Sequence, residues 1–335
     1  MARTARLKDV AAAADLSPAT VSRHLNGSLR LPDTTRRRIE EAVVRLGYRP
    51  NPHARSLSLG RSDLIGLVLP ELANPFFARL ADAVERAAHE RGVGLLLCTT
   101  SNQPDRELDY LRRLRGQHMD GLLFLTNHAD DGTLAAAIDA AERVVLLDED
   151  VPGTAVPRVL ADNERGGWLG ARRLLDAGHR ALAAIGGPPG LLSTAERSAG
   201  FRRAVREQPD AAVTAEFLGA YTREHGRAAA RRLLTEAPHT TAVFTANDEI
   251  LIGLLEVLDE RGLSVPGHLS VVTFDDAGPL HLFKPAVTAV RQDVAGMGRH
   301  AVALLLAAGR TPAGSSARIG VSLVERASVG PPRLG

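Results

Sequence analysis

From residue 62 onward, short apolar runs alternate with stretches whose apolar residues recur at helical spacing. The first run, Leu64–Leu69, is followed by a helical pattern over 76–91. Later runs predict strands at Leu95–Cys98, Leu122–Leu125 and Val144–Leu147, with helices over 104–115 and 132–141 between them. Strands and helices that alternate in this way predict a parallel sheet covered by helices on both faces.

The alternation restarts after Asp162. This second set predicts strands over 181–185, 214–218, 242–245 and 270–274, and helices over 164–177, 195–207, 223–236 and 248–261. Two successive sets predict two similar α/β lobes. Because small ligands bind at the carboxyl ends of such strands, we expect a ligand-binding cleft between the lobes.

The first fifty residues predict a small all-helical domain instead. One face of a first short helix is formed by Leu7, Val10, Ala11 and Ala14. Ser17 is typical of an N-cap, with Pro18 at the first position of a second helix over Pro18–Leu25, and Asp33 is expected to cap a third. Two short helices joined by a tight turn predict a helix-turn-helix, whose second helix enters the major groove of DNA.

The charges are distributed unevenly between these regions. Residues 1–60 contain eleven basic and five acidic side chains, whereas the other 275 residues contain 30 basic and 34 acidic ones. A basic head on a mildly acidic body favours a polyanionic partner for the head. A solvated surface on a small domain would account for the same charge, so this observation alone leaves both interpretations open.

The outward face of the predicted second helix carries small and polar side chains, namely Ala19, Thr20, Ser22, Arg23 and Asn26. Ser17 and the neighbouring backbone amides suit phosphate contacts, and Arg23 can donate two hydrogen bonds to a guanine edge. An unrelated three-helix bundle would explain the helices but not this face.

Residues 48–60 connect the head to the body. Asn51 as N-cap and Pro52 at the first helical position predict a helix too short to be stable in isolation, which we interpret as a hinge. On this helix, Leu57 suits an apolar wedge between base steps in the minor groove. A linker whose leucine packs on its own domain is the alternative.

Four motifs of the head follow one another in a specific order: Leu7–Ala11, Ser17–Arg23, Leu25–Gly27 and Leu46–Asn51. In this order and spacing they resemble the DNA-binding head of the LacI/GalR (lac repressor-like) transcription regulators, and the resemblance continues into the body, over nearly the whole chain. It implies that the DNA-binding residues are Leu7, Ser17, Pro18, Ala19, Thr20, Ser22, Arg23, Asn26, Arg30, Tyr48, Asn51, Ala54, Arg55 and Leu57. Two residues depart from the family pattern: Asp15 stands where the turn usually has glycine or asparagine, and His24 replaces a small apolar residue.

The body resembles the periplasmic-binding-protein-like core of that family, in which the chain crosses between two lobes three times. The resemblance implies a helix-turn-helix domain over 1–50, a hinge helix and linker over 51–61, and an effector-binding and dimerisation core over 62–330. The first lobe would comprise about 62–161 and 292–318, and the second about 162–291 and 319–330. A last strand near Ile319–Val324 would complete the second lobe.

The candidate effector-binding residues follow predicted strands or lie where the family places its ligand contacts: Phe76, Asp148, Ser193, Arg197, Tyr221, Asn247, Asp275 and Gln292. Arginine, aspartate and asparagine offer the donors and acceptors that vicinal sugar hydroxyls need, and an aromatic ring covers the apolar face of a sugar. Any one of them alone is better explained as a satisfied loop group, an ion pair or a core side chain. Together, the polar members look more like the sugar-responsive regulators than the purine-responsive ones.

The sequence offers little support for an enzyme. The glycine-rich Gly186–Gly190 segment is not followed by the Gly-Lys-Ser/Thr of a phosphate-binding loop. None of the eleven histidines stands at metal-ligand spacing from Cys98 or from a carboxylate. We therefore expect no catalytic residue, no cofactor and no metal.

No apolar run approaches the roughly 20 residues of a membrane span, and the start of the chain lacks an apolar signal core. The single cysteine fits a reducing compartment. We therefore expect a cytoplasmic protein that does not contact membranes. A secreted solute-binding protein would share the core, but the basic head and the missing signal count against it.

These observations lead us to interpret the sequence as that of a homodimeric repressor that binds a pseudo-palindromic operator and responds to a small molecule, a sugar or sugar derivative. The alternative is a DNA-binding regulator whose effector site is vestigial or takes a non-sugar ligand such as a nucleobase. Whether the effector releases DNA or strengthens its binding stays open at this point.

Overall fold

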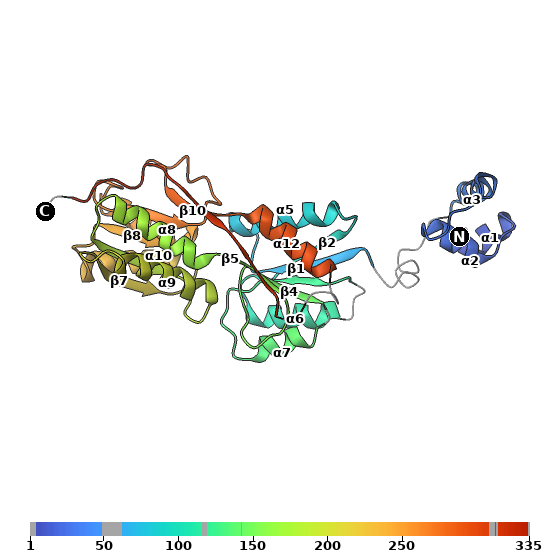
Figure 1. Cartoon of the computed structure of the whole chain (residues 1–335), viewed down its shortest axis with the longest axis horizontal. Coiled ribbons are helices and arrows are strands. Elements are labelled where there is room, and N and C mark those ends of the chain that lie inside the picture. Colours follow the sequence, from blue (N-terminus) through green and yellow to red (C-terminus); the bar gives the residue numbers. More distant parts are fainter. Residues whose placement is uncertain are drawn as a thin grey trace. The chain divides into compact units, whose positions relative to one another are not determined.

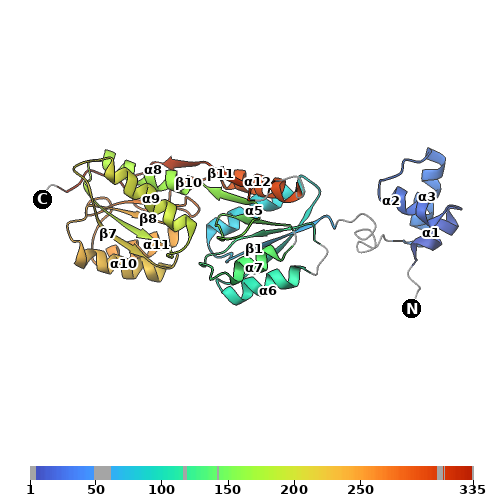
Figure 2. The ribbon, with the colours of Figure 1, turned by 60° about the horizontal axis from the view of Figure 1, so that its bottom comes forward.

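The computed structural model describes residues 5–48, 62–115, 119–141, 143–307, 312 and 314–333 of the 335-residue chain. The chain divides into two compact units, Met1–Asp63 and Leu64–Gly335, which are drawn in Figures 1 and 2. The expected hinge over 51–61 lies outside the described residues.

The head consists of three helices, α1 (Leu7–Ala13), α2 (Pro18–Leu25) and α3 (Asp33–Leu46). Ser17 caps α2 as predicted, because its Oγ accepts a hydrogen bond from the amide of Thr20 at 3.1 Å. The prediction that Asp33 caps α3 is wrong: Asp33 is the first residue of the helix, and its carboxylate pairs with Arg36 at 2.8 Å. The hydrophobic core of the head consists of Val10, Ala11, Ala14, Val21, Ile39 and Ala42.

Asp15, in the tight turn between α1 and α2, adopts a left-handed backbone conformation with φ of 52°. Glycine suits this conformation best, and aspartate is one of the few other residues that tolerate it. Arg38 of α3 donates to the backbone carbonyl of Ala14 and pairs with the Asp15 carboxylate at 3.3 Å. Asp15, one of the two residues that depart from the family pattern, therefore also joins the turn to α3.

The first lobe of the core is built on a six-stranded sheet in the order β11-β5-β4-β3-β1-β2, in which every neighbouring pair is parallel. Its strands are β1 (Leu64–Leu69), β2 (Gly94–Thr99), β3 (Leu122–Phe124), β4 (Val144–Leu147), β5 (Arg158–Ala161) and β11 (Ser316–Ile319). One face is covered by α5 (Pro75–His89) and α12 (Val294–Leu306), the other by α6 (Pro104–Arg115) and α7 (Thr133–Asp139). Because both faces are covered, β1 is apolar along almost its whole length.

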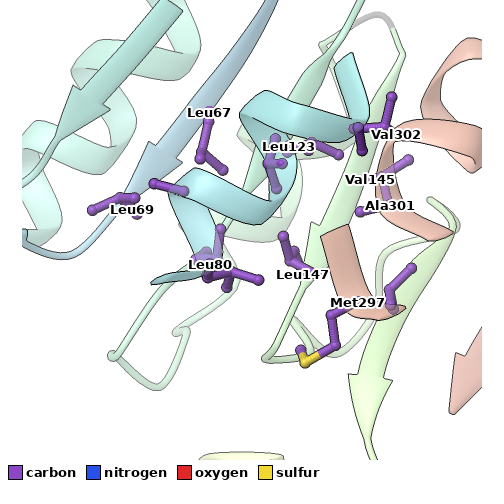
Figure 3. Close-up of a cluster of buried hydrophobic side chains, with 14 of the residues drawn as sticks. Leu67, Leu69, Leu80, Leu123, Val145, Leu147, Met297, Ala301 and Val302 are labelled. Atoms are coloured by element: carbon purple, nitrogen blue, oxygen red, sulfur yellow. The ribbon is translucent and has the colours of Figure 1, made fainter. Parts of the chain in front are cut away.

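Figure 3 shows how α5 and α12, far apart in sequence, share one apolar core. Leu80 of α5 and Met297 of α12 lie together against the sheet, beside Leu147 of β4. The two helices approach closely because Gly298 has no side chain to meet the backbone of Ala83. The helix α12, which follows the second lobe in the sequence, is thus fixed in the first lobe.

The second lobe has a sheet of the same size, in the order β12-β10-β9-β8-β6-β7. Its strands are β6 (Ala181–Gly186), β7 (Ala212–Leu218), β8 (Ala242–Thr245), β9 (Ser270–Phe274), β10 (Thr288–Gln292) and β12 (Val321–Val324). One face is covered by α8 (Asn163–Asp176) and α9 (Leu192–Arg206), the other by α10 (Arg223–Glu236) and α11 (Asp248–Glu260). This sheet is not wholly parallel, because β12 runs antiparallel to β10.

The chain passes between the sheets three times: from β5 to α8, from β10 to α12, and from β11 to β12. The predicted last strand near Ile319–Val324 is confirmed as β12, which lies in the sheet of the second lobe, although Ile319 itself ends β11 of the first sheet. The single residue Gly320 separates β11 from β12, which belong to different sheets. Neither β5 nor β10 is predicted by the sequence, because β5 begins with Arg158 and β10 ends with Arg291 and Gln292, so neither is a continuous apolar run.

Candidate ligand-binding cleft and DNA-reading surface

Residues that follow strands of both sheets meet at a cleft. The cleft is lined by Glu71, Asn74, Phe76, Phe77, Asn127, Asp148, Glu149, Ser193, Arg197, Tyr221, Asn247 and Asp275. All but one of the predicted effector-binding residues are in this set. The exception, Gln292, donates from Nε2 to Oδ1 of Asp275 at 2.7 Å and lines an adjoining pocket that shares Phe76 and Asp275 with the cleft.

Arg197, on α9, is the one arginine or lysine that lines the cleft within the described residues. Its side chain is only 5% exposed. Nε donates to Oδ1 of Asn163 at 2.8 Å, one terminal nitrogen donates to the carbonyl of Ala246 at 2.7 Å, and the guanidinium lies 3.8 Å from the ring centre of Phe274. The helix starts at Leu192 rather than at the predicted residue 195, which places Arg197 in its second turn.

Three carboxylic acids interact electrostatically with this arginine, namely the half-buried Asp148 and the buried Glu149 and Asp275, and a further buried acid, Asp248, interacts with Asp275. Burial raises the pKa of Asp148 to about 7; Arg197 opposes the rise, and Asp275 and Glu149 add to it. Burial, with Asp275 and Glu249, raises the pKa of Asp248 to about 7. Burial also raises the pKa of Asp275, against the effect of Arg197. Near neutral pH the cleft therefore offers both hydroxyl donors and carboxylate acceptors to a ligand.

Some buried polar atoms in the described part of the chain lack a hydrogen-bond partner, and one of them belongs to a residue that lines the cleft and two to residues that hold Arg197 and Asp275. Within the described residues they include Oδ1 of Asp148, Nδ2 of Asn163, Oγ1 of Thr245 and Oε1 of Gln292. Asn163 holds Arg197 through its other side-chain atom, and Gln292 holds Asp275 in the same way. Because a buried polar group without a partner costs about 1–3 kcal/mol, a ligand that supplies both donors and acceptors would gain from pairing with them.

Glu149 is a cleft residue that the sequence did not identify. It follows β4 of the first lobe, and its carboxylate accepts hydrogen bonds from the amide of Leu192 at 2.8 Å and from Oγ of Ser193 at 2.5 Å, at the start of α9 in the second lobe. Tyr221 reaches the same place, where its hydroxyl lies 3.1 Å from Oγ of Ser193 and 3.0 Å from Oγ1 of Thr194. The signal for Glu149 was its position beside Asp148, directly after a buried strand.

Glu71, Asn74, Phe77 and Asn127 also line the cleft without having been predicted. Asn74 was recognisable as the N-cap before Pro75, and its Oδ1 accepts from the amide of Phe76 at 2.8 Å. Its Nδ2 also lies 3.4 Å from Oδ1 of Asp248 in the second lobe. This contact between the lobes joins residues 174 positions apart, which periodicity in the sequence does not reveal.

On the head, the predicted reading face of α2 is open to solvent. Ser17, Pro18, Ala19, Arg23 and Arg30 are exposed, and Thr20, Ser22 and Asn26 are half-buried. Leu7 and Tyr48 pack against the core of the head, so a structural role accounts for both. The other predicted DNA contacts, Asn51, Ala54, Arg55 and Leu57, lie outside the described residues.

His24, on α2, is half-buried, and its Nδ1 lies 3.4 Å from the carbonyl of Leu29 in the following loop. Among the residues that the structure describes, no group of three or more histidine, cysteine or acidic side chains could hold a metal ion. Among the same residues, no helix is long and apolar enough to cross a membrane.

Comparison with known proteins identifies the family. Residues 6–51 match the model of bacterial regulatory proteins of the lacI family, and residues 171–329 match that of a periplasmic binding protein-like domain. The HTH-type transcriptional regulator DegA of Bacillus subtilis (strain 168) is 33% identical over 332 residues, which cover 96% of this chain and 97% of DegA. The chain belongs to the LacI family.

Solved structures of LacI-family proteins share the whole architecture. A lac repressor dimer bound to operator and an anti-inducer matches with a TM-score of 0.84 and 27% identity, over 98% of this chain and 100% of that one. A complex of the transcriptional regulator CelR with cellobiose matches with a TM-score of 0.73 and 33% identity, over 97% and 99%. This LacI-family protein is thus a DNA-binding transcriptional regulator and not an enzyme.

Proposed function

We propose that this regulator is a repressor that binds a pseudo-palindromic operator as a homodimer, and that a carbohydrate bound in the cleft controls this binding. The lac repressor structure supports the first part, because that relative is a dimer on operator DNA. The CelR structure supports the second, because that relative holds cellobiose. A cytoplasmic location follows from this function.

The observation that carries the sugar proposal is the mixture of donors and acceptors in the cleft. Arg197 can only donate, Asp148 and Asp275 accept or donate according to their protonation, and Asn247 can do both. A sugar hydroxyl is itself both a donor and an acceptor, so one ring can pair with all of these groups. Phe76 lines the cleft with the small part of its ring that the core leaves exposed, and this part offers an apolar surface to a sugar ring.

For the head, we propose that α2 enters the major groove and that Arg23 reads a guanine. The exposed Ser17, Pro18 and Ala19 would lie at the sugar–phosphate backbone and the base edges. Leu57, in the proposed hinge over 51–61, would insert at the centre of the operator in the minor groove. We propose the domain division 1–50, 51–61 and 62–330 on the same grounds.

Two measurements test the proposal together. Selection of bound fragments from random duplexes, repeated with and without a panel of mono- and disaccharides, should yield an inverted-repeat operator whose binding a sugar alters. Calorimetry with the same panel should give heat for that sugar. Nucleobases are tested in the same way. If a nucleobase gives heat and no sugar does, the effector is a nucleobase and not a carbohydrate. If no ligand gives heat, the cleft is vestigial.

A further inference from the structure

Glu107 is a buried acid that no step of the proposed function uses. It lies on α6 and is 1% exposed. Both of its carboxylate oxygens lie 3.0 Å from Oγ1 of Thr126, and Oε1 lies 3.2 Å from Nδ1 of His128. The carboxylate therefore holds two residues of the segment that follows β3, and His128 is the one basic side chain recorded against it in the described part of the chain.

The residue between these two, Asn127, lines the cleft. Its Nδ2 donates to Oδ1 of Asn102 at 3.1 Å, and the amide of His128 donates to Oγ1 of Thr126 at 3.0 Å. Asn127 is thus flanked on both sides by residues that bind Glu107. The contacts with Glu107 therefore hold the chain on both sides of a residue that lines the cleft.

Other charged groups near this segment are engaged elsewhere. Arg106, beside Glu107 on α6, donates to Ser101 and Tyr110. Asp130 accepts from the amides of Leu134 and Ala135, and Asp131 accepts from the amide of Thr133. Of these charged side chains, His128 is therefore the one that pairs with Glu107.

The hydrogen bond to Glu107 raises the pKa of His128; burial opposes the rise, and the charge of Glu107 and the Asn102 backbone add to it. A histidine whose pKa is higher in the folded than in the unfolded chain stabilises the fold at low pH. That contribution is lost as the pH rises through the folded-state pKa.

We propose that Glu107 and His128 are positioning residues for the effector cleft, which hold Asn127 in place while His128 carries its proton and release it when that proton is lost. Effector binding would then weaken from mildly acidic to mildly alkaline pH. This inference rests on the proposed function only in treating the cleft as the effector site. The contacts of Glu107 with Thr126 and His128, called the clamp below, can be measured without a ligand.

The test without ligand is hydrogen–deuterium exchange of peptides that cover residues 122–130, at pH 6 and pH 8 and corrected for the intrinsic rate. We expect exchange at Asn127 and His128 to be about fivefold faster at pH 8 in the wild type. His128→Gln should exchange at the same rate at both pH values. His89→Gln, at an exposed histidine in the last turn of α5, is the matched control and should behave as the wild type. Equal exchange at the two pH values in the wild type would overturn the proposal.

The test with ligand uses cellobiose as the probe, in calorimetry over the same pH range. Asp148 and Asp248 titrate in this range too, so the contribution of His128 is the difference between the wild-type and His128→Gln curves. We expect the affinity of the wild type to fall by about fivefold more than that of the variant. If the affinities of the wild type and of His128→Gln change in parallel with pH, His128 does not influence binding in the cleft. If cellobiose and the rest of the sugar panel fail to bind while exchange still depends on His128, the carbohydrate proposal fails and the clamp stands.

Discussion

Asp148 and Asp275 occupy equivalent places in the two lobes. Asp148 follows β4 and Asp275 follows β9, each the third strand in the order of its own sheet, and both leave the strand in a left-handed conformation with φ of 71° and 69°. Each interacts electrostatically with Arg197, and burial raises the pKa of both carboxyl groups. The ends of two equivalent strands, one from each lobe, thus line the cleft together with Arg197.

The raised pKa of Asp148 predicts how stability changes with pH. Its pKa of about 7 in the folded chain lies above the ordinary value of 3.8, so the folded state binds more protons and stability falls as the pH rises between these values. Asp148→Asn mimics the protonated acid and should remove a loss of up to about 4 kcal/mol between pH 4 and pH 8. Urea denaturation across this range measures it.

Asp248 also has a pKa raised to about 7, so it contributes to the change of stability over the same pH range. The prediction therefore concerns the difference in stability between Asp148→Asn and the wild type, and not the wild-type curve alone. Asp82→Asn, at an exposed carboxylate on α5, is the matched control and should leave the curve unchanged. If Asp148→Asn and the wild type lose stability in parallel as the pH rises, then Asp148 is ionised in the fold and the assignment is wrong.

Arg197→Ala should separate effector response from DNA binding. The variant loses the cation that faces Asp148 and Asp275, so we expect it to be destabilised by about 3–5 kcal/mol. The head does not depend on this side chain, so operator affinity should stay within twofold by fluorescence anisotropy at a temperature where the core is folded. Calorimetry with the responding sugar should give no heat. A variant that responds at the wild-type sugar concentration would place the effector elsewhere.

The strand ends could be predicted from the sequence because each buried strand is a continuous apolar run that stops at a polar residue. Asp148 after Val144–Leu147 and Asp275 after β9 were found in this way. Arg197 was found only through the resemblance to a family, since nothing in a helix of mixed composition marks one arginine as buried.

What the sequence did not reveal depends on contacts between distant segments. Glu149 lies at the cleft because it meets the start of α9, and Asn163 supports the cleft because it holds Arg197. Glu107 looks like an ordinary surface acid of α6 until the fold buries it under Thr126. Each of these pairings follows from the order of strands in the sheets, which local periodicity does not determine.

Arg23 should carry base discrimination by the head. Its side chain is exposed on α2, and no hydrogen bond or ion pair of its guanidinium is recorded among residues 5–48. Arg23→Ala should narrow the gap between operator and random DNA by roughly 1–3 kcal/mol. Arg37→Ala, at an exposed arginine of α3, is the control and should at most weaken binding to all sequences equally. Competition binding at fixed salt measures both, and retained discrimination in Arg23→Ala would exclude Arg23 from base reading.

The close packing of α8 on α9 should be the most sensitive point of the cleft's framework. A Cβ at Gly200 would lie 1.9 Å from the carbonyl oxygen of Glu164, and one at Gly167 would lie 2.1 Å from that of Arg197. These two glycines let the helices approach so closely that Asn163 reaches Arg197. Gly200→Ala must push the helices apart, because the atoms it meets are backbone, and we expect a loss of about 3 kcal/mol in unfolding free energy together with weaker effector binding. Gly320→Ala, where a Cβ meets nothing within 4 Å, is the control and should leave both unchanged. Urea denaturation and calorimetry decide the matter, and a Gly200→Ala variant as stable as the wild type would show that the contact between α8 and α9 is loose.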